Sequence, residues 1–146
     1  MSDSYLQFSE KLYLQNKKHK AWFEENLVVC DPDKDHTKNP LKPLYDTLVE
    51  EEFPCFAWEM ESDGLWVYSE ENAMVHHVAL VVQEFFKAFS LHNRSFSVPW
   101  ALTCSRPVLS EFGGGAFFVT SKKIEYFDTS DWICKKAESF RKSLKK

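Results

Sequence analysis

Three carboxylates at alternate positions, Glu59, Glu61 and Asp63, have the spacing in this chain that most clearly suggests chemistry. Side chains two positions apart on a β-strand project from the same face, so we expect these three to lie together. Clustered carboxylates can bind Mg²⁺ or Ca²⁺, divide the roles of general acid and base, or attract a cationic partner. The Asp-x-Asp-x-Asp-Gly calcium loop is absent from the sequence. The simplest interpretation is the polar outer face of a strand, and no metal is predicted.

These carboxylates belong to a strongly segregated charge pattern. From Pro43 to Phe86 the sequence has ten carboxylates and no lysine or arginine, whereas residues 87–146 have eleven basic and five acidic side chains. The net charge of −4 therefore conceals a dipolar chain, whose field would steer a basic partner to one side. An ordinary solvated surface, segregated by chance, is the alternative. We predict that the acidic segment binds a basic protein surface through Glu59, Glu61, Asp63, Glu70 and Glu71.

Three of the four glycines stand together in EFGGGAFFV, which suggests either a ligand-binding loop or a structural role. A Walker loop would end in Lys-Ser/Thr and open a helix, but here a strand-like segment follows and the next lysine is Lys122. A nucleophile elbow would place Ser or Cys between the glycines. Glycines at the start of a strand instead permit a bulge or the close approach of a backbone or large ring. The alternative is a loop whose amides contact a ligand, formed by Glu111, Gly113, Gly114 and Gly115.

Histidines and cysteines show no metal-binding spacing. His76 and His77 are adjacent, so on a helix they point about 100° apart and cannot share a metal; we expect them at the surface or its boundary. The cysteines contain no C-x-x-C pair, and no secretory signal begins the chain, so we expect reduced, mostly buried thiols. No cofactor is predicted. The four cysteines are Cys30, Cys55, Cys104 and Cys134.

The apolar pattern predicts four helices. Residues 4–26 carry a wide apolar stripe without Gly or Pro, and residues 44–53 form a shorter segment that ends before a proline. From position 75 to 89, Val and Phe recur at steps of three and four, which predicts a helix lying flat on a sheet. A last amphipathic helix begins near Thr129 or Ser130, which we expect to cap it.

Strands are predicted between these helices. FAWEMESDGLWVYS reads as a hairpin that turns at Asp63-Gly64, and AFFVTSKKIEYFD reads as a second one. FSVPWALTC alternates too, and Pro99 within it indicates an edge strand or a bulge. We therefore predict one α+β domain over residues 1–146, in the order α-α-ββ-α-β-ββ-α. Its antiparallel sheet has about five strands, and its helices pack mainly on one face.

The composition limits the function classes further. With 146 residues and 44% hydrophobic side chains, the chain is long enough for one packed core. Its apolar runs are too short to span a bilayer, so we expect a soluble cytoplasmic protein without a membrane partner. The favoured hypothesis is a non-enzymatic interaction or regulatory protein, because no catalytic signature is present.

Two other hypotheses follow from the charged residues. One is a carboxylate-based, metal-dependent hydrolase that uses Glu59, Glu61, Asp63 and Glu111. The other is a nucleic-acid-contacting domain, although the sequence pI of about 5.7 argues against nonspecific binding as the main activity. Its phosphate contacts would be Lys135, Lys136, Arg141, Lys142, Lys145 and Lys146.

Overall fold

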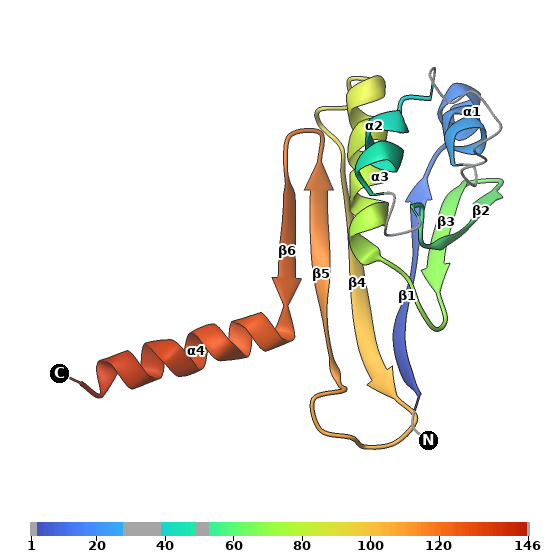
Figure 1. The fold of residues 1–146 in the computed structure, drawn as a ribbon. Helices are drawn as coiled ribbons and strands as arrows, with labels where there is room; N and C mark the ends of the chain where they lie inside the picture. Colours follow the sequence, from blue (N-terminus) through green and yellow to red (C-terminus); the bar gives the residue numbers. More distant parts are fainter. Residues whose placement is uncertain (1–2, 28–38, 49–52, 146) are drawn as a thin grey trace.

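The computed structural model describes residues 3–27, 39–48 and 53–145, which form an antiparallel sheet of six strands with helices packed against it (Figure 1). The α+β class is therefore confirmed, with one strand more than expected. The order across the sheet is β2-β3-β1-β4-β5-β6. The strands span Ser4–Tyr13 (β1), Ala57–Glu61 (β2), Gly64–Ser69 (β3), Ser95–Cys104 (β4), Gly113–Thr120 (β5) and Ile124–Asp128 (β6).

The helices span Lys17–Asn26 (α1), Lys42–Thr47 (α2), Val75–Ala88 (α3) and Thr129–Ser143 (α4). The predicted helix around 75–89 is confirmed, and α3 contacts β5 and β6. Helix α2 starts before the predicted segment 44–53, of which residues 49–52 lie outside the described residues. Buried aromatic rings of different helices contact one another in the core. They include Phe23 of α1 and Phe85 of α3, whose centroids lie 4.6 Å apart.

The prediction of one helix over residues 4–26 is wrong, because its first part is strand β1 and only Lys17–Asn26 is helical. β1 pairs with β3 along one edge and with β4 along the other, so neighbours distant in sequence fix its conformation. The N-cap of α1 is Asn16, whose side chain accepts from the N–H of Lys18. The inward residues of this segment fall on even positions: Leu6, Phe8, Leu12 and Leu14.

The first hairpin is confirmed, but its turn lies at Ser62-Asp63 instead of Asp63-Gly64. Gly64 is the first residue of β3 and pairs with Tyr13. A Cβ at this position would collide with the backbone carbonyl of Leu12. Glycine is therefore needed for the close approach of β1 rather than for the turn itself.

Strand β4 is an interior strand, so the prediction that Pro99 marks an edge strand is wrong. Pro99 pairs with Ala116 of β5, whereas β1 pairs only with residues 101–104 of β4. The proline therefore lies where β4 has a ladder on one side. An imino residue is tolerated at such a position because no amide hydrogen is required there.

Helix α4 contacts β5 and β6, but Figure 1 shows it leading away from the sheet, and none of its described residues is buried. The predicted helix therefore contacts the sheet, but its apolar face stays outside the core. Its N-cap is Asp128, whose side chain accepts from the N–H of Asp131, and not Thr129 or Ser130 as predicted. The exposed apolar residues of its face are Trp132, Ile133, Phe140 and Leu144.

Candidate functional site

The hairpin of β2 and β3 forms one edge of the sheet and carries the predicted carboxylates on its outward face. Glu59 pairs with Trp66, and Trp66 pairs with Lys11 of β1, so the three side chains form a row across three strands. Between the outward residues, Leu65 and Val67 are fully buried on the helix side. The alternation of the strands thus places an acidic and aromatic surface opposite the core, as the sequence predicts for Glu59 and Glu61.

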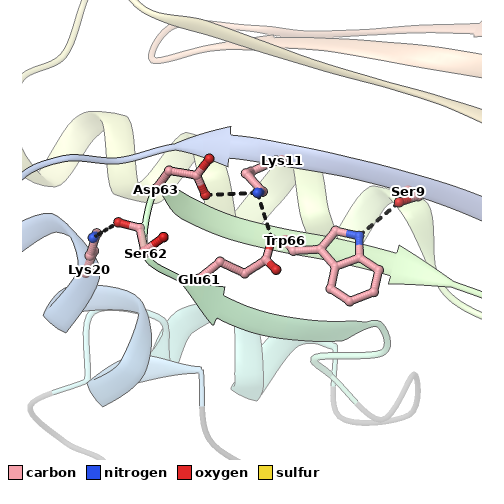
Figure 2. Close-up of polar contacts among 7 residues, drawn as sticks. All are labelled: Ser9, Lys11, Lys20, Glu61, Ser62, Asp63 and Trp66. Atoms are coloured by element: carbon pink, nitrogen blue, oxygen red, sulfur yellow. Dashed lines mark hydrogen bonds and ion pairs between the residues drawn. The ribbon is translucent and has the colours of Figure 1, made fainter.

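Lys11 lies at the centre of this surface (Figure 2). Its Nζ is 2.8 Å from Oε1 of Glu61 and 2.9 Å from Oδ1 of Asp63. Hydrogen bonds to Glu61 and Asp63 raise the pKa of Lys11 far above its usual range, and the hydrogen bond from Lys11 lowers the pKa of Asp63. Lys20 of α1 also donates to the carbonyl of Ser62 at the turn. Two of the predicted partner-binding carboxylates are therefore already engaged by one lysine.

Trp66 provides the aromatic part of the surface. Its Nε1–H donates to Oγ of Ser9 at 2.9 Å, and its ring stacks on Tyr68 with centroids 4.0 Å apart. Both contacts fix the indole plane. Together with Lys11 and Glu61, residues Ser9, Glu10 and Trp66 line a shallow hollow of about 360 Å³. The sequence does not predict Ser9, Glu10 and Lys11 at this surface, because the pattern of residues 4–13 favours a helix. It places Trp66 in the hairpin without indicating a role for it.

Glu59 differs from the two carboxylates that hold Lys11. It is exposed, and among the described residues no lysine or arginine forms an ion pair with it. Its cross-strand partner is Trp66, which lines the hollow. A carboxylate without a cation beside an aromatic face is a favourable environment for an incoming lysine or arginine.

The other two predicted partner-binding residues lie apart from this surface. Glu70 and Glu71 follow the opposite end of β3, about 20 Å from the hairpin turn at roughly 3.3 Å per residue. Their backbone carbonyls accept from Gln7 Nε2 and Leu6 N–H, and both side chains are exposed. The five predicted carboxylates therefore form two groups and not one patch.

Glu111 lies near this second group. Its Oε2 accepts from Oγ of Ser4, at 2.5 Å. Ser4 and Lys11 are seven positions apart on β1, which separates Glu111 from the hairpin carboxylates by about 23 Å at roughly 3.3 Å per residue. Glu59, Glu61, Asp63 and Glu111 thus do not converge on one metal. Within the described residues no group of three or more His, Cys, Asp or Glu could hold an ion.

The three glycines lie inside β5, and the structural interpretation of them is confirmed. A Cβ at Gly115 would collide with the carbonyl of Phe127 and with the indole of Trp100. The N–H of Gly114 donates to Oγ1 of Thr129 at 3.2 Å. A ligand held by Glu111 and these glycines stays a prediction.

His77 is fully buried, so the expectation of a surface position is wrong for it. Phe53 contacts the His77 ring, with centroids 5.0 Å apart. Nδ1 of His77 accepts from the N–H of Cys55 at 3.0 Å. The ring therefore secures the segment before β2.

The expectation of reduced, mostly buried thiols is met only in part. Cys55, Cys104 and Cys134 are free, but Cys134 is exposed and the other two are half-buried. Cys134 lies on α4, whose side chains stay outside the core, which explains its exposure. Cys30 lies outside the described residues.

The basic residues of α4 follow β6, at the opposite edge of the sheet from the acidic hairpin. β2 and β6 are the outermost strands of the order, so about 24 Å separates them at roughly 4.8 Å per strand. On α4, Lys135 and Lys142 form ion pairs with Asp131 and Glu138 at 2.9 and 3.2 Å. These two predicted phosphate contacts are therefore engaged within the helix. Lys146 lies outside the described residues.

In comparisons with protein-family models, curated proteins and solved structures, nothing matches this chain. Among the described residues, none of the helices combines the length and apolar character needed to cross a membrane.

Proposed function

We propose that this chain is a non-enzymatic interaction protein that binds a basic protein surface through the outward face of its β2–β3 hairpin. The single observation that supports this proposal is the pairing of Glu59 with Trp66 beside a hollow on a sheet face. An incoming lysine or arginine would meet a carboxylate and the face of an indole at the same time. Cation–π contacts contribute about 0.5–1 kcal/mol at exposed sites, and charge-assisted hydrogen bonds add to them.

Lys11 does not compete for this carboxylate, because Glu61 and Asp63 hold it on the turn side. The ion pairs instead keep the surface in place by tying β1 to the turn. Since Trp66 is also fixed by Ser9 and Tyr68, the indole loses little freedom when a partner binds. The edge position and the charge segregation further favour approach of a basic partner from this side.

The test compares Glu59→Lys with Glu125→Lys. Glu125 is an exposed glutamate on β6, so the control makes the same charge change at the opposite edge of the sheet. The probe is a lysine-rich peptide, and its affinity is measured by calorimetry at low and high salt. We expect Glu59→Lys to weaken binding at least tenfold and Glu125→Lys to change it less than twofold. Thermal unfolding of the three proteins should coincide.

A second pair of variants tests the aromatic contribution. Trp66→Phe keeps a ring but loses the Ser9 hydrogen bond, whereas Trp66→Leu removes the ring. Affinity should fall modestly in the first and several-fold in the second. Peptide affinity that is equal in the parent protein, Glu59→Lys and Trp66→Leu would exclude the hairpin as the binding surface.

A further inference from the structure

Helix α4 has one apolar face that the described residues leave without a neighbour. Ile133, Ala137, Phe140 and Leu144 recur at steps of four, three and four, which places them on one side of the helix. The exposed fractions of Ile133, Phe140 and Leu144 are 59%, 64% and 67%. The ion pairs of α4 lie on the opposite side. A contiguous apolar face of this kind is typical of a surface that another element covers.

An apolar groove of about 310 Å³ lies beside the start of this helix. It lies next to the first turn of α3, over the part of the sheet where Trp100 and Leu102 of β4 lie. Tyr126 of β6 forms a wall of the groove and is 53% exposed. Side chains from three strands thus form a concave surface that is apolar and accessible.

The charges around the groove complement those of the helix. Residues 129–145 carry five cations and two carboxylates. Two further hollows continue from the groove: the first shares Leu6 with it and contains Glu111, and the second lies next to the first and contains Glu71. None of the described residues that line these three hollows is a lysine or an arginine. A basic amphipathic helix therefore matches the groove in polarity and in charge.

The geometry at the start of α4 keeps the helix out of the groove of its own chain. Asp128 is the last residue of β6, lines the groove, and caps α4 by accepting from the N–H of Asp131 at 2.9 Å. The next residue, Thr129, accepts from the N–H of Gly114 at 3.2 Å. No residue separates strand from helix, so these two bonds fix the direction in which α4 leaves the sheet (Figure 1).

We propose that two copies of this chain form a dimer by exchanging α4, with each helix lying in the groove of the other copy. A twofold dimer contains this contact twice, because each copy supplies one helix and one groove. A helix of this length extends about 22 Å, and the twofold arrangement doubles the area that one helix and one groove bury. This dimer is independent of the hairpin surface, which lies at the other edge of the sheet.

The first experiment measures the mass of the full chain in solution by light scattering after size exclusion. We expect a dimer, and we expect Ile133→Ser with Phe140→Ser to yield a folded monomer, because both side chains are exposed in the single chain. This monomer should unfold at a lower temperature than the dimer, since it lacks the stabilisation that association adds. The matched control is Lys135→Ser with Lys142→Ser, which has the same spacing on the opposite face and should remain a dimer. A monomeric parent chain, or a dimer that survives the apolar substitutions, would overturn the proposal.

The second experiment distinguishes exchange from a helix that folds back on its own chain. One chain carries Ala137→Cys and another carries Tyr126→Cys, both with Cys134→Ser, and the mixture is treated with a short bismaleimide. A covalent heterodimer is expected, and neither the Cys134→Ser parent nor either cysteine variant alone should give a covalent dimer in comparable yield. Efficient cross-linking within one chain that carries both cysteines, without any covalent dimer, would instead show fold-back and overturn the exchange.

A third measurement tests whether the apolar face of α4 binds an anionic membrane instead of a second copy of the chain. The parent chain is sedimented with vesicles of phosphatidylserine and phosphatidylcholine. We expect the dimer to stay in the supernatant, because its apolar helix faces are covered. Sedimentation that Ile133→Ser with Phe140→Ser abolishes would assign the face to lipid and contradict the proposal.

Discussion

The indole of Trp100 lies against the backbone of Gly115, at the position where β4 and β5 pair these two residues. A Cβ at Gly115 would lie 2.5 Å from Cζ2 of Trp100, and it would also collide with the carbonyl of Phe127 on β6. The ring and the neighbouring strand together leave room only for hydrogen at this position. The rare glycine run is thus explained by packing within the sheet.

Gly115→Ala should therefore destabilise the fold strongly. Because the new methyl group meets a backbone carbonyl as well as a ring, the strands must shift, and we expect a loss of about 3 kcal/mol in the free energy of unfolding. Gly113→Ala is the matched control. Its Cβ would meet Oγ1 of Thr129 at 3.0 Å and Cδ1 of Leu102 at 3.8 Å, so a loss below about 1 kcal/mol is expected. Urea denaturation measures both, and equal losses would contradict this account.

The sequence predicts the sheet and its hairpins well, because alternation along β2, β4 and β5 is a local property. It fails at β1, where residues 4–13 contain apolar positions compatible with either period. The deciding information is the pairing with β3 and β4, which comes from segments more than fifty residues away. Two local signals favoured the strand: apolar residues at even positions, and Asn16 as a helix cap.

Because residues 4–13 were predicted as a helix, the β1 side of the candidate site could not be predicted. Once residues 4–13 are a strand, Lys11 must lie beside Trp66 and near the turn carboxylates. The acidic character of the hairpin was predictable from sequence, but its partial neutralisation by Lys11 was not. The position of α4 outside the core could not be predicted either, because an amphipathic pattern predicts an apolar face without indicating which chain covers it.

The pKa of Asp63 should depend on Lys11. The hydrogen bond from Lys11 lowers the pKa of Asp63 in the folded chain. The carboxylate therefore stabilises the fold above the pKa of an unfolded aspartate, and this contribution is lost as the pH falls through the lower folded value. Lys11→Met keeps the aliphatic stem, and we expect it to raise the pKa of Asp63 toward its ordinary value. Carboxyl-carbon NMR over an acid titration measures this change.

The control for this titration is Lys123→Met, which removes the partner of Glu125 on β6. It should leave the pKa of Asp63 unchanged. The difference in stability between the parent chain and Lys11→Met should also disappear at a pH below the folded pKa of Asp63. A pKa of Asp63 that Lys11→Met does not move would show that the ion pair is absent in solution.

His77 should be required for stability as a hydrogen-bond acceptor. His77→Leu places an apolar side chain at this buried position and leaves the part-buried N–H of Cys55 without Nδ1, so we expect a loss of about 1–3 kcal/mol. His77→Asn retains an acceptor oxygen close to the position of Nδ1 and should lose less. His76→Leu is the control on the adjacent, partly exposed position. Equal stability of His77→Leu and His77→Asn in urea denaturation would show that the hydrogen bond contributes nothing.

Asp128 should determine the order of the first turn of α4. Because its side chain accepts from the N–H of Asp131, Asp128→Ala should cost about 1 kcal/mol of helix stability, whereas asparagine caps as well as aspartate. Asp128→Asn should therefore behave like the parent chain, and Ser130→Ala should have no effect. Hydrogen exchange of the α4 amides measures this directly, since faster exchange is expected only in Asp128→Ala. If Ser130→Ala accelerated exchange instead, the cap would lie where the sequence pattern placed it.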